Sequence, residues 1–155
     1  MTLSLREFTG TNAGTESAAV TATSLISADL PTGIPADNPV VPGTNSYERW
    51  LAVVCDSADG AYSNFYVELN PVSGALPDGV TIRVGTTATA ATPTAATSTV
   101  AKTTLTAGRR YTFDTSILDT VNARTAYLVL QETVAASAAS GAIDQQTLAF
   151  GWAKG

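Results

Sequence analysis

The apolar residues of this chain recur with a spacing of two over several short segments, which is the spacing of β-strands. The clearest segment is 47–56, YERWLAVVCD, in which the odd and the even positions from Trp50 to Cys55 are both apolar. Such a strand is buried on its two faces, which indicates a central strand. No segment keeps the three-and-four spacing of an amphipathic helix over a helix's length. The sequence therefore predicts a mainly β fold.

Turn signals separate the predicted strands. Asp59-Gly60 follows the first strand, and Pro77, Asp78 and Gly79 precede another that begins at Val80. Between the two turns, segment 64–70 (NFYVELN) alternates apolar and polar residues, so we expect three antiparallel strands in succession. Further strands are predicted at 98–105, 109–114, 125–134 and 146–152, with 135–145 as a long hairpin loop.

A chain of 155 residues favours one domain. Residues 46–155 are expected to form a single-domain antiparallel β-sandwich, or a jelly-roll-like body. Residues 1–45 are rich in Pro and Gly, and within them only 18–27 (AAVTATSLIS) has the character of an ordinary strand. We therefore expect an extended N-terminal arm, whose first 14 residues could be removed without unfolding the body.

The thinly charged composition bears on the partners. Charged residues make up 14% of the chain, against about 25% in average domains, so a partner is expected to cover much of the surface. A net charge of −5 with eight Lys and Arg argues against nucleic acid as that partner. Arg109-Arg110, the one basic pair, is interpreted as part of a solvated turn before a strand.

The single cysteine and the N-terminus bear on location. Cys55 has no partner for an intrachain disulfide, and its place in LAVVCD indicates a small apolar strand residue. Folding in a reducing compartment is therefore expected. Arg6 and Glu7 fall where a signal peptide needs an apolar core, and the longest apolar run, WLAVVC, is far below the roughly 20 residues of a membrane span. We expect synthesis in a cytoplasm and neither export by the standard route nor membrane attachment.

The sequence shows no constellation of catalytic residues. It has no histidine, no Gly-rich phosphate loop and no nucleophile elbow, so we predict no catalytic, cofactor-binding or metal-binding residue and no enzyme activity. A pair of carboxylates could still hydrolyse a glycoside, although most of the acidic residues are interpreted as solvated turn positions. The candidates by residue type are Asp56, Asp59, Glu68, Asp78, Asp114, Asp119 and Glu132. Segment 56–60, DSADG, resembles part of a calcium loop but lacks the distal Glu, and a hairpin turn is the favoured interpretation.

Two interpretations apply to the aromatic residues. They are expected to form the core, since each buries about 150–250 Å² and the other apolar residues are mostly small. The alternative is a platform on which sugars stack, for which Trp152 and Tyr66 are the best candidates. The full set is Tyr47, Trp50, Phe65, Tyr66, Tyr111, Phe113, Tyr127, Phe150 and Trp152.

Four stretches together resemble small structural proteins of tailed bacteriophages. They are LREFTGTNAGTES (5–17), NPVVPGTNSYERWL (38–51), GALPDGVTIRVGTTATAATPT (74–94) and YLVLQETVAASAASGAIDQQTLAFGW (127–152). The resemblance implies a non-enzymatic virion protein, best fitted to the decoration or cement role on the capsid surface. It further implies the major capsid protein as partner and a homo-oligomer, most often a trimer. The alternatives are a tail or neck component, or a carbohydrate-binding module that engages host surface glycans.

The Thr/Ala-rich run 84–103 belongs to the same domain, because apolar alternation leads into it and resumes after it. We expect Thr86 to Ala91 to continue the preceding strand, Pro93 to break it, and the chain to return from Thr97 onward. The small side chains of the run would suit close packing against another protomer or the shell. The run is therefore a candidate contact ribbon.

Overall fold

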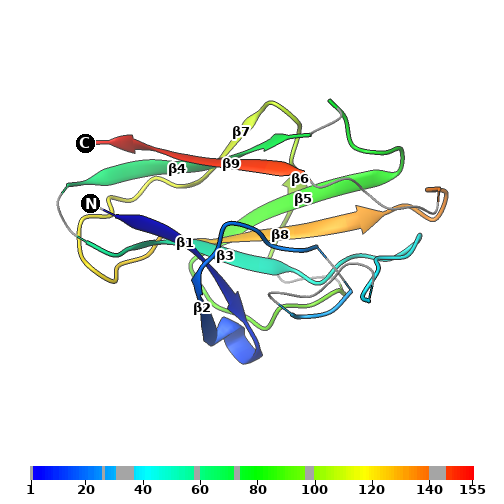
Figure 1. Cartoon of the computed structure of the whole chain (residues 1–155), viewed down its shortest axis with the longest axis horizontal. Helices are drawn as coiled ribbons and strands as arrows, with labels where there is room; N and C mark the ends of the chain where they lie inside the picture. The colour runs from blue at the N-terminus through cyan, green and yellow to red at the C-terminus, as the bar shows by residue number, and fades with distance from the viewer. Residues whose placement is uncertain are drawn as a thin grey trace.

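The computed structural model of the chain, shown in Figure 1, is mainly β and contains two antiparallel sheets. It describes residues 2–25, 27–30, 37–57, 60–71, 74–96, 100–139 and 146–155. Within these residues the larger sheet has six strands in the order β2-β1-β3-β8-β5-β6, and the smaller has three in the order β7-β4-β9. This agrees with the fold class predicted from the spacing of two.

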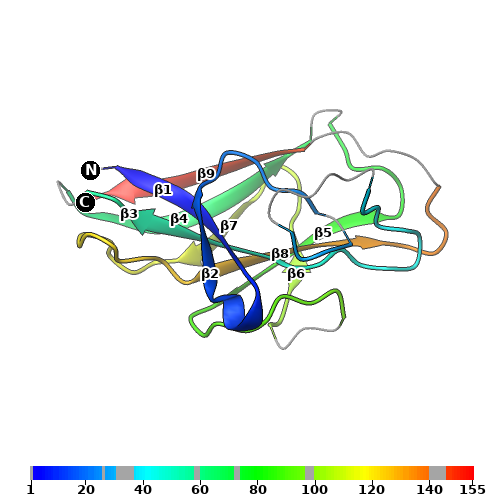
Figure 2. The ribbon, with the colours of Figure 1, turned by 60° about the horizontal axis from the view of Figure 1, so that its bottom comes forward.

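The strands of the larger sheet are β1 (Leu3–Thr9), β2 (Thr15–Ala19), β3 (Arg49–Cys55), β5 (Val80–Thr87), β6 (Thr103–Thr104) and β8 (Tyr127–Val134). Those of the smaller sheet are β4 (Tyr62–Asn70), β7 (Arg110–Asp114) and β9 (Thr147–Lys154), and a single 3₁₀ turn, η1 (Thr11–Ala13), joins β1 to β2. The η1 end of the β1–β2 hairpin projects away from the other strands in both views of the ribbon (Figures 1 and 2).

One apolar core lies between the two sheets. Leu51 and Val53 of β3 and Leu128 of β8 contribute to it from the larger sheet, and Phe65 and Val67 of β4 from the smaller. Every residue of β3 is buried, whereas the alternate residues Phe65, Val67 and Leu69 are the buried ones in β4. These patterns confirm the predicted central strand and the predicted half-buried strand.

The predicted succession of three antiparallel strands is wrong. The strands β3 and β5 lie in the larger sheet and β4 lies in the smaller one, so the chain crosses between the sheets twice. The two edges of β3 pair with β1 and β8, which leaves no edge for β4. The turn before β5 is present, since the Val80 N–H donates to the Pro77 carbonyl and Gly79 has a φ of 82°, but it joins two sheets. Asp59 lies outside the described residues.

The prediction that 18–27 holds the strand of the N-terminal region is also wrong. The strands of this region are β1 and β2, and β2 includes only Ala18 and Ala19 of the predicted segment. The strand β1 pairs with β3 from Leu3 opposite Cys55 to Phe8 opposite Trp50. The Arg6 and Glu7 side chains break the apolar alternation of β1, and so hide it in the sequence. Residues 3–19 are therefore part of the larger sheet, which corrects the expectation of an extended arm over 1–45 for this portion.

A buried cluster of charges ties the following segment onto the sheet. Arg49 Nη1 lies 3.5 Å from Glu7 Oε1 and 3.9 Å from Asp29 Oδ1, and the side chains of Arg49 and Glu7 are fully buried. The Arg49 guanidinium also donates to the carbonyls of Ser24 and Ala28, at 2.6 and 2.9 Å. Burial raises the pKa of Glu7, while attraction to Arg49 opposes that rise. Residues 23–25 and 27–29 thus cover the charges of β1 and β3.

The described part of the Thr/Ala run packs on the outer face of the larger sheet. A second apolar cluster there contains Trp50, Tyr127 and Val129, and Ala90 and Ala91 pack against it. The strand expected through Ala91 ends at Thr87 instead, because the chain turns to lie across the sheet. Pro93 is buried beyond that bend, and the return expected at Thr97 falls outside the described residues.

The run approaches the sheet closely at Gly85. A Cβ atom at this position would lie 2.4 Å from the Ala101 carbonyl oxygen, so no larger residue fits without a backbone shift. Beneath the run, Lys102 Nζ lies 2.5 Å from Glu48 Oε1, and the Trp50 indole N–H donates to Glu48 Oε2 at 3.0 Å. One side of the run therefore packs against the interior of the protein.

None of the helices in the described part of the chain has the length and apolar character that crossing a bilayer requires.

We predict that deleting residues 1–14 abolishes cooperative unfolding of the whole protein. The deletion exposes one edge of β3 and leaves Arg49 buried without Glu7; loss of one partner of a buried pair costs about 3–5 kcal/mol, and whole domains have about 5–15 kcal/mol. Calorimetry measures the transition, with deletion of residues 1 and 2 as the control. A sharp transition at an unchanged midpoint would instead support a dispensable arm.

Candidate functional site

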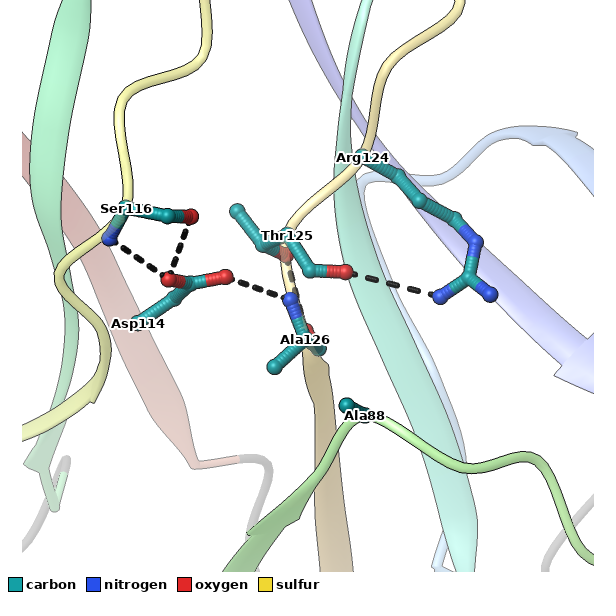
Figure 3. Close-up of a pocket in the computed structure, with 6 residues that line it drawn as sticks. All are labelled: Ala88, Asp114, Ser116, Arg124, Thr125 and Ala126. Atoms are coloured by element: carbon teal, nitrogen blue, oxygen red, sulfur yellow. Dashed lines mark hydrogen bonds between the residues drawn. The ribbon is translucent and has the colours of Figure 1, made fainter.

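A surface hollow of about 510 Å³ lies where β7 ends and β8 begins. Figure 3 shows the residues that line it, which come from the end of β7, the segment before β8 and the residue after β5. They are Ala88, Asp114, Ser116, Arg124, Thr125 and Ala126. Because β7 belongs to the smaller sheet and β8 to the larger, the hollow lies over a junction between the sheets.

The Asp114 carboxylate is fixed by three hydrogen bonds. Oδ1 accepts from the Ser116 N–H at 2.8 Å and from the Ser116 hydroxyl at 2.6 Å, and Oδ2 accepts from the Ala126 N–H at 2.5 Å. Burial by itself raises the pKa of Asp114, but these bonds together outweigh burial and lower the pKa below its ordinary value. Asp114 is therefore ionised, and its carboxylate links the end of β7 in the smaller sheet to the residue before β8 in the larger sheet.

Arg124 carries the positive charge of the hollow. Its guanidinium carbon lies 4.1 Å from the centre of the Tyr127 ring and 5.8 Å from that of Phe8, and the two rings meet edge to face. Figure 3 shows Arg124 and Asp114 on opposite sides of the Thr125–Ala126 backbone. Cation–π contact orients the guanidinium, and its side chain remains exposed to solvent.

Among the described residues that line the hollow, Asp114 is the one acidic side chain, whereas hydrolysis by paired carboxylates needs two. The Ser116 hydroxyl donates its proton to Asp114, within a bond that orients the 114–116 turn. The exposed guanidinium of Arg124 offers N–H donors to an acceptor group of a partner or ligand.

The other candidate carboxylates are dispersed. Asp56 accepts from Arg6 at 2.6 Å and from Ser4 at 3.1 Å, and Glu68 lies 3.5 Å from Arg110. Asp78 and Asp119 are exposed, as predicted for solvated positions. Asp59 lies outside the described residues, so the calcium-like segment 56–60 is described only in part.

Glu132 differs from the solvated position that was predicted. It lies in β8 opposite Ile82 of β5, its side chain is buried, and its Oε1 has no hydrogen-bond partner among the described residues. Burial raises its pKa to about 7. The sequence holds a signal for this burial, because Glu132 lies within QETV, where an apolar strand continues to Val134.

In the described ranges, no side chains are arranged for metal binding or for thiol chemistry. No three of the acidic or cysteine side chains there gather as a metal ion would require. Cys55 is fully buried in β3, which agrees with its interpretation as a small apolar strand residue.

Most of the described aromatic residues form the core or pack against it. Trp152 and Tyr66, the two candidates for a sugar platform, lie outside it. Trp152 is 42% exposed, and its ring meets Tyr62 at 84° and Phe65 at 42°, so it has no coplanar partner among these contacts. Tyr66 lies against Gly151, where a Cβ would lie 2.3 Å from the ring, and the guanidinium of Arg110 lies 4.3 Å from the ring centre. These contacts reduce the ring surface of Tyr66 on which a sugar could stack.

No protein-family model, curated protein or solved structure matches the chain. The role of Arg124 was not predicted, because no sequence pattern shows that the turn at 114–116 and the segment at 124–126 lie together.

We predict that Glu132→Gln stabilises the protein above neutral pH. The folded state keeps the Glu132 proton up to about pH 7, whereas an unfolded glutamate releases it near pH 4.3. The free energy of unfolding therefore falls as pH rises through this interval, and glutamine, which stays neutral, removes that loss. We expect a gain of about 4 kcal/mol at pH 8 and little change at pH 4.

Urea unfolding at the two pH values measures this effect. Glu68→Gln, which removes a partly exposed carboxylate, is the control for the loss of one negative charge. Parallel stability curves for the wild type and Glu132→Gln across pH 4–8 would show that Glu132 does not titrate in this interval.

Proposed function

We propose that this protein is a non-enzymatic structural protein of a tailed-phage virion, a decoration or cement protein that binds the assembled head through the major capsid protein. In this proposal the two sheets form a β-sandwich of jelly-roll-like character on the capsid surface. The chain is made in the host cytoplasm and acts by binding alone.

One observation carries the proposal. The four stretches that resemble phage structural proteins contain all or part of five of the six strands of the larger sheet, namely β1, β2, β3, β5 and β8, and most of β9 in the smaller sheet. Stretches that are far apart in the sequence thus lie side by side in the larger sheet. There β1 pairs with β3, and β8 pairs with β3 and β5.

The exposed side of the Thr/Ala run is the contact surface that we propose for the shell. Ala88, Thr89, Thr92, Ala96 and Ala101 are exposed and uncharged, whereas the opposite side of the run packs on the outer apolar cluster. The run is held by the buried Glu48–Lys102 pair, so little order is lost when it binds. A small, uncharged surface on a firm support allows close approach of a partner.

Stabilisation of the head follows from mass action. A protein that binds the assembled shell and not the free subunits favours the shell, by about 4 kcal/mol per site at a thousand times its dissociation constant. Repeated sites on one head multiply the effect. No reaction at the hollow is required.

We predict that the purified protein sediments with heads that lack it and raises their disruption temperature. Ala101→Glu places a charge on the proposed contact surface and should weaken binding at least tenfold, because a buried unpaired charge is costly. Ala107→Glu, in the turn before β7, adds the same charge elsewhere and should bind as the wild type. If folded wild-type protein neither sediments with the heads nor stabilises them, the cement role is wrong.

A glycan-binding role is the second candidate function, favoured by the exposure of Trp152. It predicts retention on host-wall polysaccharide and a loss of that retention in Trp152→Ala. Affinity chromatography on immobilised polysaccharide tests it, with Ile117→Ala as an exposed apolar control. Equal elution of the wild type and Trp152→Ala would remove this candidate.

A further inference from the structure

The four edge strands of the two sheets differ in how they are protected. Among the described residues, β2 and β7 have five residues each and carry charged side chains, and β6 has two residues. The fourth edge strand, β9, has eight residues, and its only charged residue is Lys154 at the last position. Exposed sheet edges are normally kept short or charged, because an unprotected edge pairs with other strands.

The side chains of β9 differ between its two faces. Leu148 and Phe150 pack against the core, and Trp152 is on the same face but 42% exposed. The opposite face carries the small residues Ala149, Gly151 and Ala153. One edge of β9 pairs with β4, and no described strand pairs with the other edge, to which every second residue directs its N–H and C=O groups.

We propose that β9 is the interface with a second copy of this chain. The two β9 strands pair antiparallel about a twofold axis with Phe150 opposite the partner's Phe150, which joins two three-stranded sheets into one of six strands. Trp152 then lies opposite the partner's Leu148, and its exposed surface becomes covered.

The sequence of β9 is complementary to itself in this register. The pairs on the outer face join Gly151 to the partner's Ala149 and Ala153 to the partner's Thr147, and Lys154 lies opposite the partner's Gln146. Large residues thus meet large ones, small residues meet small ones, and no like charges oppose one another.

The neighbouring registers of the two β9 strands pair the side chains less favourably. A shift of one residue would place core-facing side chains opposite outward-facing ones. A shift of two residues places Lys154 opposite the partner's Leu148 in one direction, and Trp152 opposite the partner's Gln146 in the other. The self-complementary register is the reason to assign a second copy, and not an unrelated strand, to this edge.

The interface closes at two copies. An isologous contact uses the same edge of each protomer, so nothing remains for a third. The outer edges of the joined sheet are the short, charged β7 strands, which oppose further growth. This number differs from the trimer that the family resemblance implies, and a mass measurement separates the two.

Light scattering coupled to size exclusion tests the proposal on the purified full chain. The wild type is expected at twice the 15.9 kDa chain mass, and Trp152→Lys, which places a charge opposite the partner's Leu148, at the single chain mass. The matched control is Ile117→Lys, because Ile117 is 67% exposed outside β9, and this variant should remain a dimer. Thermal unfolding of each variant reports whether it is folded.

Tryptophan quenching by acrylamide gives a second measurement that needs no variant. Trp50 is fully buried, so quenching reports Trp152, and it should decrease as protein concentration rises through the dimerisation range. A wild type that stays monomeric, a trimer or larger species, a folded Trp152→Lys that remains dimeric, or quenching that is independent of concentration would each overturn the proposal.

Discussion

The buried contact between Arg49 and Glu7 determines how the first part of the chain is arranged. It joins β3 to β1 inside the larger sheet, and the same guanidinium holds residues 24 and 28 by their carbonyl groups. Two charges away from water are unfavourable unless each is paired and hydrogen-bonded. The ion pair and the hydrogen bonds of Glu7 to Thr23 and of Arg49 to the carbonyls of Ser24 and Ala28 form only when β1 is in register and these residues lie over it. The cluster therefore couples the position of β1 and of residues 23, 24 and 28 to the central strand.

The larger sheet is covered on both faces, by two different means. The smaller sheet covers the inner face with apolar side chains, whereas the outer face is covered by an irregular run of small residues. The run adds few large apolar groups, and a buried Glu48–Lys102 pair and the indole N–H of Trp50 supply polar contacts beneath it. This explains how a chain poor in charge and rich in Ala and Thr buries a two-sided central strand.

Sequence reasoning succeeded where one local pattern decides the structure. The strands around Trp50, Phe65 and Leu128 were predicted because apolar residues recur at a spacing of two and turn residues bound them. Sequence reasoning failed for β1, whose charges are satisfied by Arg49 and Asp56, more than 40 positions away in the sequence. An Asp-Gly or Pro-Asp-Gly turn is compatible with a hairpin and with a crossing between sheets, so the sheet that holds β4 was not predictable. The hollow at Asp114 and Arg124 likewise depends on which loops meet.

The crossings from β3 to β4 and from β4 to β5 have a consequence for how the protein forms. Neighbours in the sheets are remote in the sequence, and folds dominated by such contacts form slowly. The strand β3 pairs with β8, which begins at Tyr127, so a nascent chain exposes one edge of its most apolar strand until most of the sequence has been synthesised. The larger sheet is thus completed late, and the chain depends on remaining soluble during that interval.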